Sequence, residues 1–215
     1  MQSSFKTFGF LLLLFAIAGS LTYFYRHKPA ISHTRSSRPT ASVNNAAYLF
    51  RIKQKATAFK KLNAGLQYNS SYCFLIDMRI ASGKKRFFVY NPEKDSIETS
   101  GLVTHGSGSD KGSSPLYFSN APNSNCSSLG RYRIGNSYNG KFGLAFKLYG
   151  LDKTNSKAFE RFVVLHAHGC VPDEETDPYP ICKSWGCPTV SPNFLELLKT
   201  YIEKSHKPVM LWIYY

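Results

Sequence analysis

From Ser71 onward, short apolar runs alternate along the chain with clusters of turn-forming residues. Several of these runs are rich in β-branched and aromatic side chains, which favour strands over helices. The dipeptide Asn139-Gly140 lies between two of the runs and is typical of the tight turn of a β-hairpin. The pattern predicts strands over residues 72–78, 86–90, 97–104, 131–134, 142–148, 162–166 and 209–215.

Two other segments have apolar residues at helical spacing. Between residues 48 and 62, apolar side chains recur at helical spacing and are expected to pack in the core: Tyr48, Leu49, Ile52, Ala56, Phe59 and Leu62. Basic residues lie between them, and Gly65 is a helix stop. A second helix is expected to begin after Ser191 and Pro192, which are typical of a helix N-terminus. Short strands joined by turns, with few helices, indicate a mostly β, mostly antiparallel domain with flanking helices.

The N-terminal segment has a different character and predicts export. A lysine precedes an apolar stretch over residues 8–25, which contains a small-residue sequence, Ala16-Ile17-Ala18, of the kind found at signal-peptide cleavage sites. The same stretch is long enough to span a bilayer. Residues 1–28 are therefore expected to be either a cleaved signal peptide or a retained membrane anchor.

A linker and one folded domain are expected after this segment. Residues 29–45 are rich in Ser, Thr, Arg and Ala and lack apolar periodicity, which is typical of a tether. Residues 46–215 then form the domain, and a chain of 215 residues with 43% hydrophobic and 15% aromatic side chains can bury a sizeable core.

The formal net charge is +14, from 27 Lys and Arg against 13 Asp and Glu. Such a charge attracts polyanions, whether nucleic acid, anionic lipid or cell-wall polymers. The basic residues are scattered and no nucleic-acid-binding motif accompanies them, so we expect no nucleic-acid partner. The charge suits a protein that stays soluble beside an anionic envelope.

The residues best suited to chemistry lie close together, in the segment 161–190. Cys187 is preceded by glycine and followed by proline, so it is not expected inside a helix. Upstream, His166 ends an apolar, β-branched run, and His168 lies on the same face of the predicted strand. A thiol with a histidine base nearby is the arrangement that cysteine acyl transfer uses. Alternation along the strand does not decide which histidine is the base.

The chain has five cysteines, so at least one thiol stays unpaired within it. Cys170 and Cys182 flank the loop that follows the histidines, and we expect a disulfide between them. Cys73 and Cys126 are the alternative partners. The histidines and cysteines of this region also form a candidate zinc-ligand set, although their spacing is not that of a recognised zinc site.

Several ordered motifs resemble the murein L,D-transpeptidase catalytic-domain family, a divergent branch of the L,D-transpeptidases. The resemblance covers residues 72–215 and is carried by the run Arg-Phe-Val-Val-Leu-His that ends at His166 and by Ser-Trp-Gly-Cys-Pro around Cys187. Upstream it includes residues 104–109, 118–120, 127–130 and 150–152 with Asn155. It implies a β-sandwich or barrel-like catalytic domain with the cysteine in a groove. The sequence departs from the family after Ala167, where His168 begins an unusual stretch.

The resemblance also assigns roles to residues. It implies that Cys187 is the nucleophile and His166 its base. Ser184 and Gly186 are expected to shape the loop that presents the thiol, and the backbone amides of Gly186 and Cys187 are candidate oxyanion donors. His168 remains a candidate second base or substrate contact. The resemblance implies no metal and no other cofactor.

The function implied by the resemblance is an exported cysteine acyl-transferase of the periplasm or cell envelope, with or without anchoring through residues 8–25. Its partners would be peptidoglycan tetrapeptide stems, which it would join through a thioester acyl-enzyme. Three alternatives stay open: an L,D-carboxypeptidase that uses water as acceptor, a zinc-binding protein, and a non-catalytic cell-wall module. The residue types themselves indicate only thiol acyl transfer.

Overall fold

The computed structural model describes residues 41–65, 67–112 and 115–215. The elements in chain order are α2 (Ala41–Leu62), η1 (Asn63–Gly65), β1 (Cys73–Asp77), β2 (Phe87–Asn91), β3 (Ser96–Gly101), η2 (Ser107–Ser109), β4 (Gly130–Gly140), β5 (Gly143–Gly150), β6 (Val164–Ala167), β7 (Thr189–Val190), α3 (Pro192–Glu203) and β8 (Met210–Tyr214). The expected signal or anchor segment, residues 1–28, lies outside the described residues. Within the described part of the chain, no helix has the length and apolar character needed to cross a bilayer.

The strands form one eight-stranded sheet in the order β3-β2-β1-β8-β4-β5-β6-β7. Two neighbouring pairs, β1–β8 and β6–β7, are parallel, and the others are antiparallel. The prediction of a mostly β domain with flanking helices is confirmed, and each predicted strand is present. Strand β7 was not predicted, because two residues are too few to show a hydrophobic pattern.

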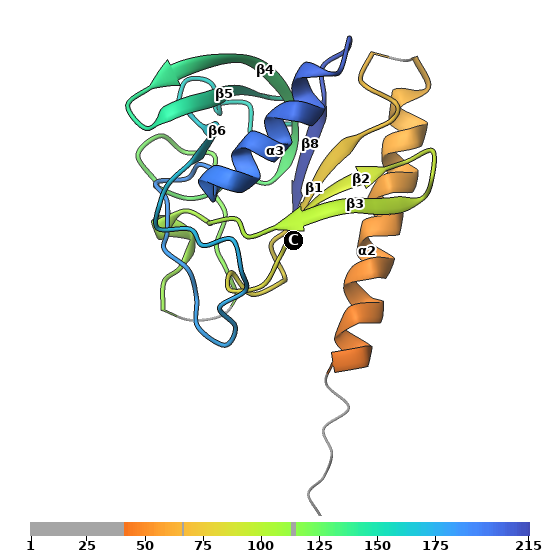
Figure 1. Cartoon of the computed structure of the whole chain (residues 1–215). Helices are drawn as coiled ribbons and strands as arrows, with labels where there is room; N and C mark the ends of the chain where they lie inside the picture. The colour runs from red at the N-terminus through yellow and green to blue at the C-terminus, as the bar shows by residue number, and fades with distance from the viewer. Residues whose placement is uncertain (1–40, 66, 113–114) are drawn as a thin grey trace, which may run out of the picture. The chain divides into compact units, whose positions relative to one another are not determined.

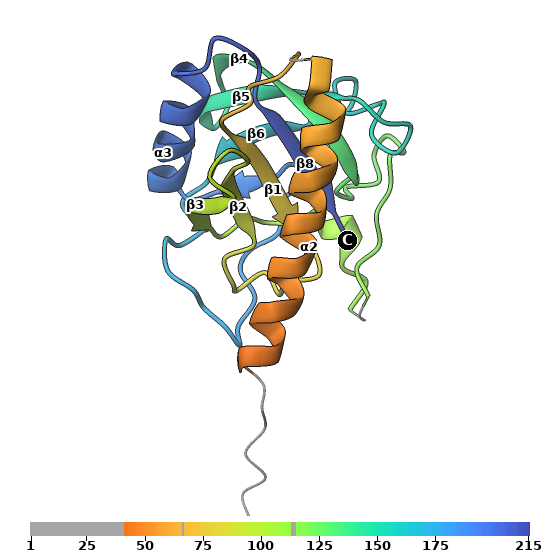
Figure 2. The same ribbon diagram turned by 90° about the vertical axis from the view of Figure 1, so that its right-hand side faces the viewer.

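Both faces of the central strands are buried, because a helix covers each face. Along β1, Phe74 and Ile76 point into a core that includes α3, whereas Cys73 and Leu75 point into a second core that includes α2. Figures 1 and 2 show the two helices on opposite sides of the sheet. Burial on both faces explains why residues 73–76 of β1 form a continuous apolar run rather than an alternating one.

Helix α2 starts at Ala41, before the domain boundary expected at residue 46, and contacts the sheet through a narrow stripe. Ile52, Ala56 and Phe59 are each at most 2% exposed and lie at the spacing that places side chains on one helical face. Leu62, which the sequence pattern also placed in the core, is 50% exposed. The helix therefore ends its contact with the sheet one turn earlier than the pattern predicted.

The two edges of the sheet are joined by the chain that follows β3. Thr104 N–H donates to Thr189 O at 2.9 Å, Ser184 N–H donates to His105 O at 3.0 Å, and Ser107 N–H donates to Ser184 O at 2.7 Å. These bonds bring the segment before β7 beside the segment after β3, so the sheet curls towards a barrel. They also satisfy backbone groups that an open sheet edge would leave unpaired.

The loop after β5 is held by a polar cluster. Arg131 forms an ion pair with Asp152, and the buried Asn155 side chain donates to Arg131 O at 2.7 Å while accepting from Asp152 N–H at 2.9 Å. A Cβ on Gly150 would lie 1.9 Å from Asn155 O, so a larger residue does not fit there. This upstream motif is therefore structural: it fixes the chain that leads towards β6.

Replacing Phe59 by Ala tests how much the α2 face contributes. Its ring is 1% exposed and packs in the core beneath α2, so we expect the free energy of unfolding to fall by about 3–5 kcal/mol. The matched control is Leu62→Ala at the exposed end of the same helix, with an expected loss below about 1 kcal/mol. Denaturant unfolding of both variants measures this, and equal losses would contradict the arrangement.

Candidate active site

Cys187 lies in a tight turn that enters β7. Gly186 has a φ of +119°, and a Cβ there would lie 2.8 Å from Cys126 O, so the position requires glycine. Ser184 Oγ donates to Cys187 O at 2.6 Å and accepts from Gly186 N–H at 3.2 Å. The Thr104 hydroxyl donates to the same Cys187 carbonyl at 3.2 Å. Side-chain hydroxyls therefore fix the backbone that presents the thiol.

The Cys187 sulfur faces the segment that enters β6. The Val164 N–H points at Sγ from 3.5 Å, and the thiol faces the Phe162 carbonyl oxygen at 3.8 Å. Burial raises the pKa of the thiol, while the Val164 N–H and the charge of Arg161 act in the opposite direction. The thiol is therefore protonated at neutral pH, and a base must remove its proton before it can attack.

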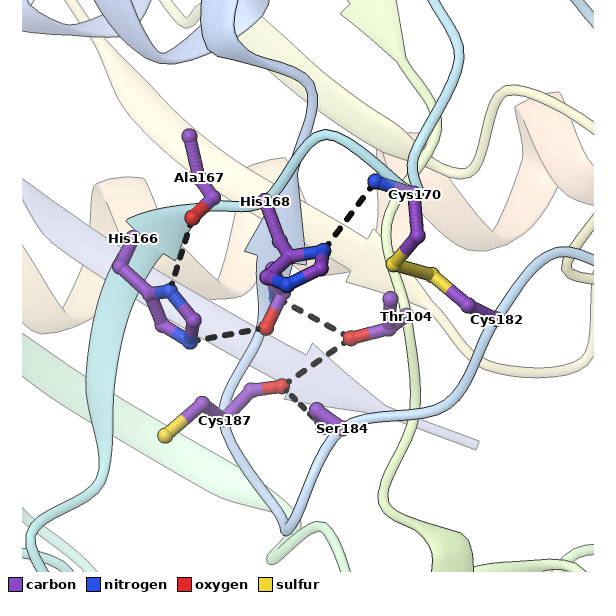
Figure 3. The surroundings of a disulfide bond; sticks show 9 residues. Thr104, His166, Ala167, His168, Cys170, Cys182, Ser184 and Cys187 are labelled. Carbon is purple, nitrogen blue, oxygen red and sulfur yellow. Dashed lines mark hydrogen bonds between the residues drawn. A yellow bond between two sulfur atoms is a disulfide. The ribbon is translucent and has the colours of Figure 1, made fainter. Parts of the chain in front are cut away.

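His166 is buried near the end of β6 with both ring nitrogens engaged (Figure 3). Nδ1 lies 3.0 Å from Ala167 O, and because a carbonyl only accepts, Nδ1 carries the proton. Nε2 then has the lone pair and accepts from the Thr189 hydroxyl at 3.0 Å. Burial lowers the pKa of His166, with the Ala167 carbonyl opposing the shift and His168 adding to it. The ring is neutral at pH 7.

Strand pairing places His166 and Cys187 at the same edge of the sheet. His166 is opposite Thr189 in the parallel β6–β7 ladder, and Thr189 is two residues beyond Cys187. No hydrogen bond joins the two side chains within the described part of the chain; the thiol faces Phe162 and the imidazole faces Thr189. The sequence analysis did not identify Thr189 as a site residue. The one feature that could have pointed to it is a hydroxyl side chain two residues after Cys187.

His168 has the opposite tautomer to His166. Its Nδ1 accepts from Cys170 N–H at 3.1 Å, so in the neutral ring Nε2 carries the proton (Figure 3). Neutral His168 has no unused lone pair, whereas His166 has one at Nε2 that only a hydroxyl engages. The geometry therefore favours His166 as the base and leaves His168 as a hydrogen-bond donor.

A groove with a volume of about 330 Å³ opens beside His168. Phe142, from the turn of the β4–β5 hairpin, forms one wall, and Leu195 of α3 forms another. The Phe142 ring stacks on His166 at 5.2 Å and meets His168 edge-on at 5.9 Å. Glu196 is the acidic residue of the lining. The groove therefore continues the site from the histidines towards α3.

The predicted disulfide between Cys170 and Cys182 is confirmed, with Cα atoms 6.1 Å apart (Figure 3). It closes the loop between β6 and residues 184–187, which are called the nucleophile turn after the role that the family resemblance implies for Cys187. It leaves Cys73, Cys126 and Cys187 free. The alternative zinc set loses two of its sulfur ligands to this bond. Among residues 41–65, 67–112 and 115–215, no cluster of three His, Cys, Asp or Glu side chains is placed to hold a metal.

The two candidate oxyanion amides differ in their surroundings. The Gly186 N–H already donates to Ser184 Oγ, so it serves the turn. The Cys187 N–H has no hydrogen-bond acceptor in the described segments. An oxyanion donor must have a free N–H that points at the developing charge. The geometry therefore favours the Cys187 amide over the Gly186 amide.

A buried polar pair supports the nucleophile turn from behind. Arg86, 1% exposed, donates through Nε and one terminal nitrogen to Val103 O and through that same nitrogen to His105 Nδ1 at 3.0 Å. His105 in turn accepts from Ser184 N–H through its carbonyl. Burial and the charge of Arg86 lower the pKa of His105 to about 4, with Asp110 opposing the shift. The sequence reasoning gave Arg86 no role, because nothing local indicates its burial.

His105 predicts a pH dependence of stability. Its folded pKa of about 4 lies below the ordinary value of about 6.5, so between these values only the unfolded chain binds the proton. The free energy of unfolding should therefore fall as the pH falls through this window. His105→Asn should flatten this slope, whereas the same change at the exposed His206 should leave it as in the unsubstituted protein. Urea unfolding at several pH values measures both slopes, and parallel slopes for all three proteins would refute the assignment.

Comparison with known proteins identifies one family whose sequence model covers most of the chain. The sequence model of the L,D-transpeptidase catalytic domain matches residues 44–214. No curated protein matches in sequence. Similar solved structures include the Ldtfm–avibactam carbamoyl enzyme, with 10% identity over 68% of this chain and 50% of that chain and a TM-score of 0.42.

Two further solved structures are similar in the same way. The cell-shape-determining protein Pgp2 of Campylobacter jejuni is 15% identical over 66% of this chain and 47% of its own, with a TM-score of 0.43. An L,D-transpeptidase of Xylanimonas cellulosilytica is 14% identical over 69% of this chain and 62% of its own, with a TM-score of 0.37. The chain thus spans about half the length of the first structures it matches. The family match covers most of the chain, and the protein therefore belongs to the L,D-transpeptidase catalytic domain family.

Proposed function

We propose that this protein is an exported cysteine acyl-transferase that acts on peptidoglycan tetrapeptide stems, with Cys187 as nucleophile and His166 as base. The family is one of L,D-transpeptidases, which act on peptidoglycan stem peptides in the cell envelope. The observation that carries the proposal is the tautomer of His166. Its Nε2 lone pair lies at the sheet edge that also presents Cys187, which is the arrangement that a thiol acyl transfer needs.

In the first step, His166 Nε2 accepts the thiol proton as Cys187 Sγ attacks the carbonyl of the third stem residue. For this the sulfur turns away from Phe162 O and the Thr189 hydroxyl releases Nε2. The carbonyl oxygen takes up negative charge, which the Cys187 N–H is placed to stabilise. The C–N bond to D-alanine then breaks, the protonated His166 gives its proton to the leaving amine, and a thioester remains.

In the second step, an amine from another stem attacks the thioester carbonyl. A new C–N bond forms and the C–S bond breaks, while His166 takes the amine proton and returns it to the sulfur. With water in place of the amine, the same steps release the free acid, and the enzyme is an L,D-carboxypeptidase. His168, a donor on the wall of the groove, is placed to contact the substrate rather than to accept its proton.

The resting pair is neutral. The pKa of the Cys187 thiol is raised and the pKa of His166 is lowered, both mainly by burial, so a preformed thiolate–imidazolium pair is disfavoured. Proton transfer then accompanies attack, and the histidine acts as a true general base. Export through residues 1–28 is part of the proposal, because the substrate lies outside the cytoplasm. The +14 charge would favour residence beside anionic wall polymers.

The central test compares three variants on a defined tetrapeptide muropeptide. Cys187→Ala should abolish D-alanine release, because no other group forms the thioester. His166→Gln should slow release by about 10²–10⁴-fold, the usual effect of losing a general base. His168→Gln is the matched control and should cost much less. Mass spectrometry of the products also separates cross-linked dimers from tripeptides, and so distinguishes amine from water as the acceptor.

Circular dichroism of each variant serves as the folding control. A folded Cys187→Ala protein that still releases D-alanine would exclude the thiol mechanism. A His168→Gln protein slower than His166→Gln would move the base by two residues.

The pH dependence of kcat/KM gives an independent prediction. Activity needs neutral His166, whose pKa burial lowers, so the acid limb should lie below the ordinary imidazole value of about 6.5. Activity should therefore persist as the pH falls through that value. Rates measured at constant ionic strength check this, and an acid limb clearly above pH 6.5 would contradict the neutral resting pair.

A further inference from the structure

Arg161, immediately before Phe162 at the entrance to β6, has an unusual set of partners. Nη1 donates to Ser119 O at 3.0 Å and to the Ser128 hydroxyl, and Nη2 donates to Cys126 O at 2.7 Å and to Ser124 Oγ at 3.3 Å. All four acceptors are neutral oxygens of one loop, residues 119–128. No carboxylate pairs with this guanidinium in the described segments of the chain, so its charge is not neutralised.

The same guanidinium lies against the nucleophile turn. A Cβ built on Gly186 would lie 3.3 Å from Arg161 Nη2 and 2.8 Å from Cys126 O, the carbonyl that Nη2 holds. Gly186 precedes Cys187 directly and has a left-handed φ of +119°. Gly186 therefore packs directly against the hydrogen-bonded pair of Arg161 Nη2 and Cys126 O.

The residue after Arg161 is strained and faces the thiol. Phe162 has a φ of +54°, a conformation that costs an aromatic residue free energy, and its ring is 85% exposed. Core packing of the ring does not hold this conformation. Backbone bonds hold it on both sides, since Arg161 N–H donates to Lys157 O and Val163 N–H donates to Ala158 O. The strained backbone directs the Phe162 carbonyl at Cys187 Sγ.

We propose that Arg161 is a positioning residue for Cys187. Its four hydrogen bonds lock the loop that supports Gly186 and anchor the strained turn whose carbonyl and amide face the sulfur. Its unneutralised charge stabilises the negative charge that develops on the sulfur as the proton leaves. The kinetic part rests on the proposed function, but the effect on the thiol itself does not.

Arg131 provides a matched control. It too is a partly buried arginine held by several hydrogen bonds, but it pairs with the carboxylate of Asp152. Loss of Arg131 should therefore lower stability without changing the thiol. Loss of Arg161 should change the pH profile of Cys187 alkylation, in addition to any change in stability.

The test uses Arg161→Met, Arg161→Lys and Arg131→Met in the full protein. The first readout is the pH profile of Cys187 alkylation by iodoacetamide, followed by peptide mass spectrometry, since Cys73 and Cys126 are buried. We expect the alkylation midpoint of Arg161→Met to move to higher pH, with Arg161→Lys between it and the unsubstituted protein. Arg131→Met should keep the original midpoint. Added guanidinium at millimolar concentration should partly restore the Arg161→Met profile.

The second readout is D-alanine release. Arg161→Met should lower kcat by about 10²-fold, the scale of a misplaced reacting group, with a smaller effect on KM. A folded Arg161→Met protein with the original midpoint and original kcat would overturn the proposal. If that variant does not fold, Arg161→Lys decides, and original values for it overturn the proposal equally. Shifted alkylation without D-alanine release by the unsubstituted protein would instead refute the proposed function and leave the positioning role standing.

Discussion

The arrangement of the candidate site depends on the hydrogen bonds that join the chain after β3 to the chain before β7. Without them, strand pairing would connect the nucleophile turn to the sheet only through the two residues of β7 beside β6. With them, Ser184 is bonded on both sides of its peptide unit, and Thr104 reaches both Thr189 and the Cys187 carbonyl. The contacts come from segments distant in sequence, so the geometry of the turn depends on the tertiary structure and not on local sequence alone. This coupling ties the turn that carries Cys187 to the curled edge of the sheet.

Electrostatics around the thiol follow from the same enclosure. Burial acts on Cys187 and His166 in opposite senses, raising the pKa of the first and lowering the pKa of the second, so both favour the neutral form. A neutral pair costs little to bury, and charge appears only as the reaction proceeds. In the proposed mechanism, that charge is stabilised by the Cys187 amide, which has no acceptor among the described residues, and by the Arg161 guanidinium, and both groups are already in place. Preorganised donors of this kind need no rearrangement when the charge develops.

The sequence predicted every strand except β7, the two helices and the Cys170–Cys182 disulfide, because each leaves a local pattern or bounds a single loop. Periodicity located Ile52, Ala56 and Phe59 correctly, but it also placed the exposed Leu62 in the core, since a pattern does not say where the opposing sheet ends. The hydrogen-bond partners of the site residues could not be predicted from the sequence. The bond between Thr189 and His166, and the bonds from Arg161 to the loop beside Gly186, join segments that are distant in sequence. The resemblance implied Cys187 as nucleophile and His166 as base, and the hydrogen bonds add a physical reason to prefer His166 to His168.

Strain and exposure are concentrated around the thiol, while the free energy of folding comes from elsewhere. Phe162 is 85% exposed at a positive φ and Trp185 is 78% exposed, and both lie within two residues of atoms that shape the nucleophile's surroundings. Two well-buried cores, one under each helix, stabilise the fold by apolar burial, and this offsets the free-energy cost of the positive φ at Phe162. Two large aromatic side chains exposed beside a reactive thiol gain nothing for the folded monomer. Under the function proposed above, a ligand bound at Cys187 would cover these two side chains and so account for their exposure.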